Sequence, residues 1–503
     1  MHLLPSPSSR AKFAGTFAAA FVAVLVLAAC AGSPSAPPAP DAATLIARAE
    51  QALGAAGAST LTVTARGSGS TFGQAYVPNN TWPALNYSVM TRAFNFDTGA
   101  MREEYGRSRA EPNGGGAVPL MGQGEQRVVG FVREGFAWNT AGTAAAAAPL
   151  AVPARQHDLW LATPHGALKA AKRFNATSGT RTVEGKTYNT LAFAVPGAFA
   201  ATLLLDADNT VARIDSTQPH PVLGDTAVVT TFADYRDIGG TLRFPMRMRQ
   251  NMGAFEVFDL TAAQVTLGTP VDVAVPDNVR AFKETVATTA VAEGVWFLAG
   301  GSHNSVAIEM DKEIVLVEAP LYDGRTLAVF AAANALVPGK KVGTVINSHH
   351  HFDHSGGLRT AVGEGATIVV NAAAKPYFER AFANPNKVAP DHLATSGKSP
   401  RLVGFSGKHV IADGKRTIEV HELQGSVHAS GFHMVWLPKE RLLIEADAFT
   451  PGPPNTPPPP VPNANNVNLV QNIERLGFNV DRILPLHSRV VPMSELLAAI
   501  GRK

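Results

Sequence analysis

The pattern of apolar residues changes near residue 280, and this change limits the possible folds more than any other feature of the sequence. Between residues 58 and 280, short runs of β-type residues are separated by turn signals such as Gly239-Gly240. From about residue 285 onward, short apolar runs alternate with helix-type patterns such as residues 323–336. We therefore predict an α+β protein, in which a mainly antiparallel β domain precedes a domain of sheets layered with helices.

The predicted N-terminal domain covers residues 42–283. Strands are expected at 60–65, 127–132, 200–205, 226–232 and 255–260, with helices at 42–53 and 158–172. The region from residue 203 to residue 267 resembles the curved antiparallel sheet of lipoprotein-carrier-like periplasmic proteins, through strand patterns with turns between them such as residues 203–215 and 235–248. The resemblance implies a curved sheet here, although it assigns no role to the domain.

The predicted C-terminal domain covers residues 284–503. Strands are expected at 295–299, 305–309, 314–318, 342–347, 367–371, 417–423, 433–437, 442–446 and 482–484, with helices at 323–336, from 358 onward, and at 467–476. Residues 451–462 are rich in proline and are predicted to form a stiff surface loop inside this domain.

The first 30 residues have the layout of an export signal that ends at the only cysteine of the chain. Arg10 and Lys12 form a short positive region, residues 13–26 are apolar, and small residues precede Cys30. This layout resembles a bacterial lipoprotein box, which implies cleavage before Cys30 and acylation of its thiol. We therefore expect a signal peptide at residues 1–30 and a tether rich in Pro, Ser and Ala at residues 31–41.

A lipid anchor predicts that the protein is tethered to a membrane of the bacterial cell envelope, facing the periplasm or the exterior. Each buried acyl methylene contributes about 0.8 kcal/mol to such anchoring. The alternative is a transmembrane helix at residues 13–29. That run is at the short end of what spans a bilayer, and the tether follows it at once, so we favour the lipoprotein interpretation.

The charge balance and the cysteine count each exclude a class of interaction. The 503 residues include 43 Lys and Arg against 40 Asp and Glu, a formal net charge of +3, and no long basic run. Nucleic-acid binding requires a concentrated basic surface, so we predict no nucleic-acid partner. Because Cys30 is the only cysteine, no disulfide within the chain and no metal site based on thiolates can form. Nothing in the sequence indicates an oligomeric state.

Histidines are concentrated in the second half of the chain. Eleven of the 15 lie after residue 300, and four of these fall within residues 348–357. His349 and His351 are two residues apart on a chain that leaves a predicted strand, so their side chains are expected to point to the same side. Asp353 and His354 continue around a turn that the two following glycines are expected to permit. One short loop can therefore supply ligands to two adjacent metal ions.

The pattern H-x-H-x-D-H resembles the metallo-β-lactamase superfamily, and this resemblance implies an αβ/βα sandwich and further metal ligands later in the chain. Three candidates follow in order, each at or just beyond the end of a predicted strand: His428, Asp447 and His487. The implied first metal site consists of His349, His351 and His428, and the second of Asp353, His354 and His487, with Asp447 as a bridge.

Other residues leave alternatives open around this ligand set. His433 is the rival of His428 for the third histidine position. His350 is expected to point away from its neighbours and is not a predicted ligand, while His421 and His409 are interpreted as ordinary sheet or surface residues. The superfamily usually has glycine after the last histidine, whereas this chain has Ser488.

The implied ligands are imidazoles and carboxylates, which suit two zinc ions per chain and do not exclude manganese or iron. Two metal ions that share a water lower its pKa and supply hydroxide as a nucleophile near neutral pH. Asp353 is the predicted catalytic residue, because it is placed to orient this hydroxide or to move its proton. The predicted reaction is hydrolysis of a small-molecule ester, thioester or lactone.

Two other functions remain as alternatives. The first is a β-lactamase, although such secreted enzymes commonly carry a lysine shortly after the bridging ligand, where this chain has Ala448, Phe449, Thr450 and Pro451. The second is an envelope binding lipoprotein with a structural metal domain. Structural zinc sites are normally closed by four protein ligands, so a complete and open two-metal set argues against that alternative.

Overall fold

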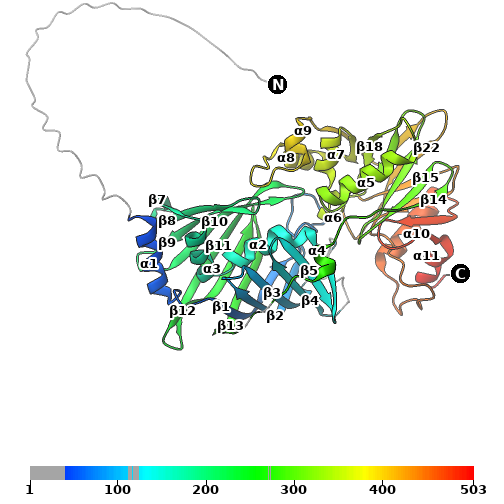
Figure 1. Cartoon of the computed structure of the whole chain (residues 1–503). Helices are drawn as coiled ribbons and strands as arrows, with labels where there is room; N and C mark the ends of the chain where they lie inside the picture. The colour runs from blue at the N-terminus through cyan, green and yellow to red at the C-terminus, as the bar shows by residue number, and fades with distance from the viewer. Residues whose placement is uncertain (1–39, 111–115, 117–123, 270, 272, 503) are drawn as a thin grey trace, which may run out of the picture. The chain divides into compact units, whose positions relative to one another are not determined.

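The computed structural model describes residues 40–110, 116, 124–269, 271 and 273–502. These residues form one compact unit, and its elements are labelled in Figure 1. None of the helices within these ranges is both long enough and apolar enough to cross a membrane. Cys30, the predicted signal peptide and most of the predicted tether lie outside the described residues.

The N-terminal region forms a single sheet of 13 strands in which all neighbours are antiparallel. The strands are β1 (Thr60–Ser70), β2 (Ala84–Asn95), β3 (Ala100–Arg109), β4 (Gln126–Arg133), β5 (Phe136–Ala141), β6 (Ala144–Ala147), β7 (Thr177–Val183), β8 (Lys186–Val195), β9 (Phe199–Leu205), β10 (Val211–His220), β11 (Gly224–Ile238), β12 (Leu242–Met252) and β13 (Phe255–Leu267). Strands β6 and β7 are the two edges, and β1 pairs with β13 in the middle. The predicted antiparallel β region is therefore confirmed.

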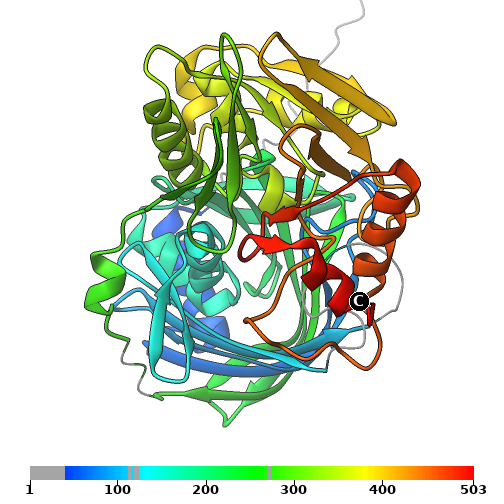
Figure 2. The same ribbon diagram turned by 90° about the vertical axis from the view of Figure 1, so that its right-hand side faces the viewer.

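The sheet curves around a small group of helices (Figure 2). They are α1 (Ala42–Leu53), η1 (Pro149–Ala151), α2 (Val152–Leu161) and α3 (Pro164–Arg173), and α4 (Asp277–Arg280) follows the last strand. Leu45, Leu161 and Leu168 of these helices are fully buried in one core cluster with Leu203 and Ile214 of the sheet. The helices thus supply the apolar surface that the inner face of the sheet requires.

The predicted single helix at residues 158–172 is wrong, because the structure breaks it into α2 and α3. Pro164 lacks an N–H and is tolerated only in the first turn of a helix. Thr163 has extended backbone angles, and its side chain accepts a hydrogen bond from the Gly166 N–H, which caps α3. The apolar periodicity continues through the break because both helices face the same core.

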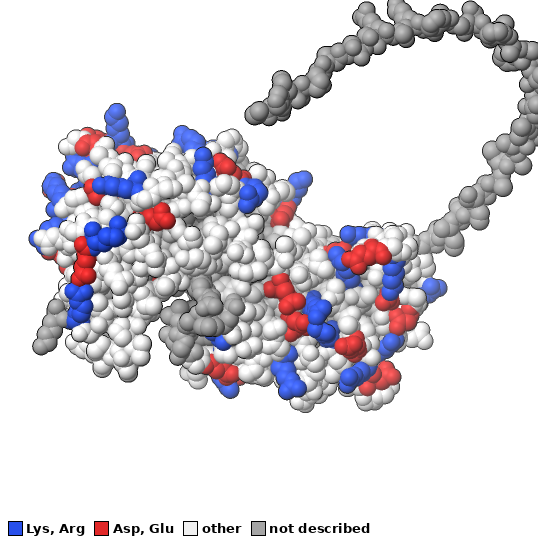
Figure 3. All heavy atoms as spheres, turned by 180° about the vertical axis from the view of Figure 1, so that it is seen from behind, with Lys and Arg blue, Asp and Glu red and all other residues white. Residues whose placement is uncertain are grey.

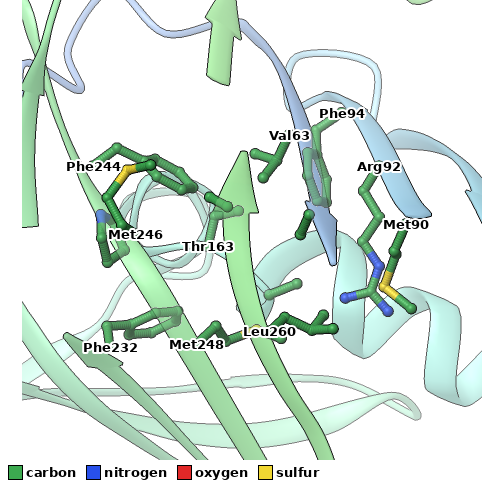
Figure 4. A pocket seen from close by; sticks show the side chains of 14 residues that line it. Val63, Met90, Arg92, Phe94, Thr163, Phe232, Phe244, Met246, Met248 and Leu260 are labelled. Atoms are coloured by element: carbon green, nitrogen blue, oxygen red, sulfur yellow. The ribbon is translucent and has the colours of Figure 1, made fainter. Parts of the chain in front are cut away.

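A cavity lies between the sheet and the helices (Figure 4). Its lining is largely apolar and includes Val63, Met90, Phe94, Phe232, Phe244 and Leu260. The cavity volume is about 40 Å³, which is enough for a small number of water molecules and far below the size of a typical ligand pocket. We interpret this cavity as a gap in packing.

The C-terminal region contains two further sheets and seven helices. The first sheet consists of β14 (Ala287–Ala292), β15 (Val295–Ala299), β16 (Ser305–Glu309), β17 (Ile314–Val317), β18 (Val342–Ile346), β19 (Thr367–Asn371) and β20 (Arg401–Phe405). The second consists of β21 (Lys408–Ala412), β22 (Thr417–Glu422), β23 (His433–Leu437), β24 (Leu442–Glu445), β25 (Arg482–Pro485) and β26 (Val491–Pro492). The helices are α5 (Asp323–Leu336), α6 (Phe352–Ser355), α7 (Leu358–Glu364), α8 (Lys375–Ala383), α9 (His392–Ser396), α10 (Ala464–Leu476) and α11 (Met493–Ala499).

Strand β17 shows how these layers pack. Its four side chains are buried and alternate between the faces of the sheet. Val315 and Val317 belong to the core that joins the two sheets, and this core also includes residues of α10 and α11. Ile314 and Leu316 instead join the core on the other face, together with residues of α5, α7 and α8. The predicted sandwich of two sheets between helices is therefore confirmed.

Candidate metal centre

The first four predicted ligands follow the end of β18, a parallel strand of the first sheet. The chain continues for a few residues and then enters α6, a single helical turn with His351 at its N-cap. The two glycines after this turn do not serve the purpose that we expected. Gly356 has a φ of −63° and needs no special backbone freedom, but a Cβ there would lie 1.9 Å from the Leu321 carbonyl oxygen. A Cβ on Gly357 would lie 1.7 Å from the Thr326 hydroxyl, so close packing requires both glycines.

The other predicted ligands come from three connections of the second sheet. His428 lies between β22 and β23, Asp447 lies two residues after β24, and His487 lies two residues after β25. Strands β24 and β25 are parallel, so their carboxyl ends meet at the same edge of the sheet. Loops that leave one edge in this way can bring side chains from distant parts of the sequence into a single site.

The structure places the donor atoms of His349, His351, His428 and Asp447 in one compact group. The Nε2 atom of His349 lies 2.9 Å from Nδ1 of His351 and 3.1 Å from Nε2 of His428. Asp447 Oδ2 lies 2.8 Å from Nε2 of His428. Two ligands of a tetrahedral zinc ion lie roughly 3.3 Å apart when each bond is about 2.0–2.1 Å long, so these separations suit a shared cation.

A second group contains His354, His487 and Asp353, together with a residue that we did not predict, His303. Nε2 of His354 lies 3.1 Å from Nε2 of His487 and 3.6 Å from Asp353 Oδ2. The His303 ring lies with its centroid 4.2 Å from that of His487, and its Nε2 is 3.1 Å from Asp353 Oδ2. His303 is either a further ligand of this group or a donor that holds Asp353.

Asp447 stands between the two groups. Its Oδ2 lies 3.3 Å from Nε2 of His349 and 3.2 Å from Nε2 of His354, while its Oδ1 lies 2.7 Å from Nε2 of His487. Burial alone would raise the pKa of Asp447, but His354, His428 and His487 outweigh burial and hold this pKa well below its ordinary value. The carboxylate is therefore charged, as a bridge between two cations requires.

The electrostatic states of the imidazoles differ with their neighbours. Burial, reinforced by neighbouring imidazoles, holds the pKa values of His349 and His351 well below the ordinary value, so both rings are neutral. Burial also opposes a charge on His354, but the carboxylates of Asp447 and Asp353 raise its pKa well above the ordinary value. Neutral rings offer a free lone pair, and the carboxylates beside His354 create a strongly negative environment that favours a cation.

Contacts on the second ring nitrogen determine which nitrogen of each histidine faces the centre. Nε2 of His351 donates to the Ala75 carbonyl at 3.0 Å, and Nδ1 of His487 donates to the Ser302 carbonyl at 3.0 Å. A carbonyl can only accept, so the opposite nitrogen of each ring carries the lone pair. These lone pairs belong to Nδ1 of His351 and Nε2 of His487, which are the atoms that face the other ligands.

Glu318 supports the centre from behind. Its Oε2 accepts a hydrogen bond from the Ser348 hydroxyl at 2.6 Å and lies 3.1 Å from Nδ1 of His354, and the Ser348 hydroxyl in turn lies 2.9 Å from Nδ1 of His349. Glu318 is fully buried and has a φ of 75°, a conformation that costs a residue with a side chain about 1–3 kcal/mol. One strained residue therefore orients a histidine of each group.

The other sequence-based alternatives are also placed by the structure. His433 lies in β23, where it stacks on Phe405 and contacts Asn371, and it belongs to neither donor group. His350 points to the Ala75 carbonyl, with Nε2 at 2.8 Å. His421 contacts Glu419, and the His409 ring packs against Phe405 at a tilt, so both are sheet residues away from the centre.

Ser488 shows why glycine is common after the last histidine. Its φ is 79°, in the left-handed region that favours glycine. The serine hydroxyl donates to the Pro451 carbonyl at 2.8 Å and so has a partner in this conformation.

Sequence reasoning did not identify three participants in the centre. His303 follows β15 within a Gly-Gly-Ser-His segment that carries no recognised spacing, and Glu318 was expected only as the end of a strand. Gln74 belongs to the N-terminal region, and its Nε2 donates to Asp353 Oδ1 at 2.8 Å. The only sequence signal for the first two was a polar residue next to a buried apolar strand, and no local signal existed for Gln74.

Comparison with known proteins agrees with this geometry. Residues 298–487 match the model of the metallo-beta-lactamase superfamily. A curated relative, the alpha subunit of 2,4-dinitroanisole O-demethylase from Nocardioides sp. (strain JS1661), is 24% identical over 220 residues, which is 43% of this chain. This chain spans 62% of the length of that relative.

Solved structures with a similar arrangement include a metallo-beta-lactamase from Pontibacter korlensis, with 15% identity, a TM-score of 0.33, and coverage of 43% of this chain and 98% of that one. They also include the metallo-beta-lactamase FIM-1 from Pseudomonas aeruginosa in its mono-zinc form, with 15% identity, a TM-score of 0.31, and coverage of 44% and 95%. On the family match, the C-terminal domain belongs to the metallo-beta-lactamase superfamily. The predicted resemblance to this superfamily is therefore confirmed.

Proposed function

We propose that the protein is a dizinc hydrolase that cleaves a small-molecule ester, thioester or lactone. The observation that carries this proposal is the pair of adjacent donor groups that share the Asp447 carboxylate. Each group combines imidazole nitrogens with carboxylate oxygen and lacks thiolate, which is a donor set that suits zinc and also accepts manganese or iron.

Bound zinc ions would supply an activated water and polarise the carbonyl of the substrate. The chain contributes a proton acceptor at the same place. Burial alone would raise the pKa of Asp353, but His354 and His303 outweigh burial and hold this pKa well below its ordinary value, so the carboxylate is ionised at neutral pH. Its Oδ2 faces His303 and His354, and Oδ2 is the atom that we expect to orient the attacking water and to take its proton.

The segment after Asp447 favours an ester, thioester or lactone over a β-lactam. The N–H groups of Ala448 and Phe449 both donate to Glu445 Oε2 at 3.0 Å, and no lysine stands in this segment to attract a substrate carboxylate. A substrate that has no carboxylate at that position loses no binding energy from the absence of a lysine, whereas a β-lactam does.

A second candidate reaction is cleavage of an activated aryl ether. It is favoured by the match to the alpha subunit of a 2,4-dinitroanisole O-demethylase, which the chain covers only in part. The same acceptor and cation groups could serve the attack on such a substrate.

The decisive experiment is a hydrolysis screen of zinc-loaded protein that lacks residues 1–30. The panel comprises a nitrophenyl ester, a thioester, a lactone, a penicillin, a carbapenem and 2,4-dinitroanisole. We expect the ester or lactone to be cleaved most efficiently, and Asp353→Asn to lower turnover at least about 100-fold. Asp237→Asn, at an exposed strand position, is the matched control and should retain full activity. A penicillin or carbapenem cleaved faster than every ester, thioester and lactone would replace this proposal with a β-lactamase.

We also propose that the enzyme works in the cell envelope as a lipoprotein anchored through Cys30 and acts without a nucleic-acid partner. The sequence layout before Cys30 supports the anchor. On the face in Figure 3, Lys and Arg side chains are interspersed with Asp and Glu, which does not favour a polyanion there. Mass spectrometry of the mature N-terminus from the native host tests the anchor, since an unmodified Cys30 is incompatible with it.

A further inference from the structure

We propose that residues 72–76 of the N-terminal region are a working part of the metal centre, with Gln74 as a positioning residue for Asp353 and the Ala75 carbonyl as a positioning group for His351. The inference rests on the proposed dizinc function and deepens it. The inference assigns the N-terminal region a role in supporting the metal centre, through the segment that follows strand β1.

The segment leaves β1 and runs directly against the helical turn that carries two predicted ligands. Gly73 accepts a hydrogen bond from the Phe352 N–H through its carbonyl at 3.3 Å. Its φ is 76°, and a Cβ at this position would lie 2.2 Å from the Phe352 ring. Only glycine permits this approach, so the sequence of the N-terminal region is adapted to the start of α6.

Aromatic packing holds the segment on the same turn. The ring of Phe72 meets the ring of Phe352 edge to face, with centroids 5.0 Å apart, and also meets Trp82 at 4.5 Å and His220 at 4.9 Å. A group of four rings from both regions therefore fixes the place of residues 72 and 352 relative to each other.

The Ala75 carbonyl accepts from two histidines at once. Nε2 of His350 lies 2.8 Å from this oxygen, and Nε2 of His351 lies 3.0 Å from it. A carbonyl has two lone pairs and no proton, so both ring nitrogens must carry hydrogen. For His351, this leaves the lone pair on Nδ1, the atom that lies 2.9 Å from Nε2 of His349 in the first donor group. Without this carbonyl, the ring is free to present the wrong nitrogen.

Gln74 acts on the second donor group. Its Nε2 donates to Asp353 Oδ1 at 2.8 Å, while His303 Nε2 approaches Oδ2 at 3.1 Å. The two oxygens of one carboxylate are thus held from two sides, one by each region of the chain. A carboxamide donor fixes the carboxylate without neutralising its charge, which leaves Asp353 able to bind a cation.

The contact continues beyond the ligands. The Tyr76 hydroxyl donates to the Ser426 carbonyl at 2.9 Å, and the Tyr76 carbonyl accepts from the Ser430 N–H at 2.8 Å. Ser426 and Ser430 stand on either side of His428, so the same short segment reaches the loop that supplies the third histidine.

The test compares two amide side chains that cross between the same two regions. Gln74→Met keeps the length of the side chain and removes the donor to Asp353. Asn384→Ala removes the donor to the Leu223 carbonyl, a 3.0 Å bond that touches no predicted ligand. Zinc binding by the protein that comprises residues 31–503 is measured by competition with a chromogenic chelator. Circular dichroism verifies that each variant is folded.

We expect Gln74→Met to weaken one of two zinc equivalents about tenfold or more, as the loss of a group that orients a ligand does. Asn384→Ala should bind both equivalents like the unmodified protein. The visible spectrum of the cobalt-loaded protein should change in Gln74→Met and remain unchanged in Asn384→Ala, because only the first variant alters a ligand of the centre.

Equal zinc affinity and an unchanged cobalt spectrum in Gln74→Met would overturn the role of Gln74, and so would an equal weakening in both variants, since that would reflect loosened packing between the regions. The result is independent of catalysis. A protein that cleaves nothing in the substrate panel but loses zinc through Gln74→Met refutes the proposed hydrolysis and retains this inference, whereas a protein that binds no zinc refutes both.

Discussion

Each half of the molecule buries a cluster of charged side chains, and the two clusters are balanced differently. In the N-terminal sheet, Arg92 donates to Glu103 at 2.6 Å and to Asp158 at 2.8 Å, so a buried cation meets buried carboxylates directly. In the C-terminal domain, ring nitrogens of several histidines lie close to one another and to the carboxylate oxygens of Asp353 and Asp447. The first cluster contains its own cation, Arg92, whereas the second presents imidazoles and carboxylates in an arrangement that suits a bound cation.

The difference teaches that burial and charge do not by themselves mark a functional site. Burial lowers the pKa of Arg92, but Asp158 and Glu103 outweigh it and raise this pKa above its ordinary value, so the ion pairs stay charged and closed. The distinguishing feature of the other cluster is that imidazole nitrogens from separate loops lie within about 3.1 Å of one another as well as near carboxylates, as the ligands of one cation do.

The largest expected effect separates the two clusters by stability. Arg92→Met leaves two carboxylates buried without a cation and should lower the free energy of unfolding by about 3–5 kcal/mol in urea denaturation. Zinc content should not change. Arg243→Met is the control, because its pair with Asp208 is partly exposed and should contribute less than about 1 kcal/mol. A loss of zinc from Arg92→Met would show that the clusters are not independent.

Metal removal should affect only the second cluster. At a free zinc concentration about 100-fold above the dissociation constant, binding adds roughly 2.7 kcal/mol to the free energy of unfolding, and a chelator should abolish this increment. The Arg92→Met variant should lose the same increment, because distant sites add independently. An unfolding curve that a chelator leaves unchanged would contradict the proposal that the C-terminal cluster binds zinc.

A buried histidine with no carboxylate beside it gives an intermediate case. Burial lowers the pKa of His165 to about 4, and its Nε2 donates only to the Leu53 carbonyl. In the unfolded chain this histidine takes up a proton near pH 6.5, whereas in the folded chain it stays neutral. Its contribution to the free energy of unfolding is therefore fully present above pH 6.5 and is lost as the pH falls toward 4. We expect His165→Gln to remove about 2 kcal/mol of the difference in unfolding free energy between pH 7 and pH 5.

The matched control for this pH dependence is His409→Gln. His409 lies in the largely exposed strand β21, and burial lowers its pKa by less than it lowers that of His165. It should alter the pH dependence less than His165→Gln does. If both variants keep the pH dependence of the parent protein, buried neutral histidines do not govern its acid stability.

The smallest effect is expected from an uncharged buried group. Thr163→Ala removes the side chain that caps α3 and should lower the free energy of unfolding by about 1 kcal/mol. Thr182→Ala, on the exposed face of β7, should change it by less than about 0.5 kcal/mol. Urea denaturation measures both values, and equal values would mean that the break between α2 and α3 is not maintained by this cap.

Local sequence signals predicted the elements that carry their own pattern. The strands at 295–299, 305–309, 367–371 and 433–437 and the helix at 323–336 have the expected bounds, because each is a short apolar run or a stretch of helix-forming residues between turn residues. The helix at 158–172 failed at a threonine and a proline whose capping role depends on where the chain turns. Strands β20 and β21 were not predicted, since their side chains are largely exposed and show little apolar pattern.

In the candidate metal centre, the sequence predicted only the residues that belong to the spaced motif or that the superfamily resemblance implies. The seven residues implied by the superfamily resemblance lie together in the structure, although their roles as ligands stay predictions. His303, Glu318 and Gln74 lie outside the motif in the sequence, and each reaches it through the tertiary fold. No inference from a single stretch of sequence could place a glutamine at residue 74 against an aspartate at residue 353.

The pairing of β1 with β13 also determines when the N-terminal sheet can be completed. Leu61 lies opposite Leu267 and Gly69 lies opposite Phe258, whereas the other strands pair with neighbours in the sequence. Such neighbours can form hairpins in roughly 1–10 µs, but the central pairing must first close a loop that includes almost the whole domain. During translation, the centre of the sheet therefore remains unpaired until the ribosome begins to synthesise the C-terminal domain, and refolding of the isolated chain should show the slow kinetics of high contact order.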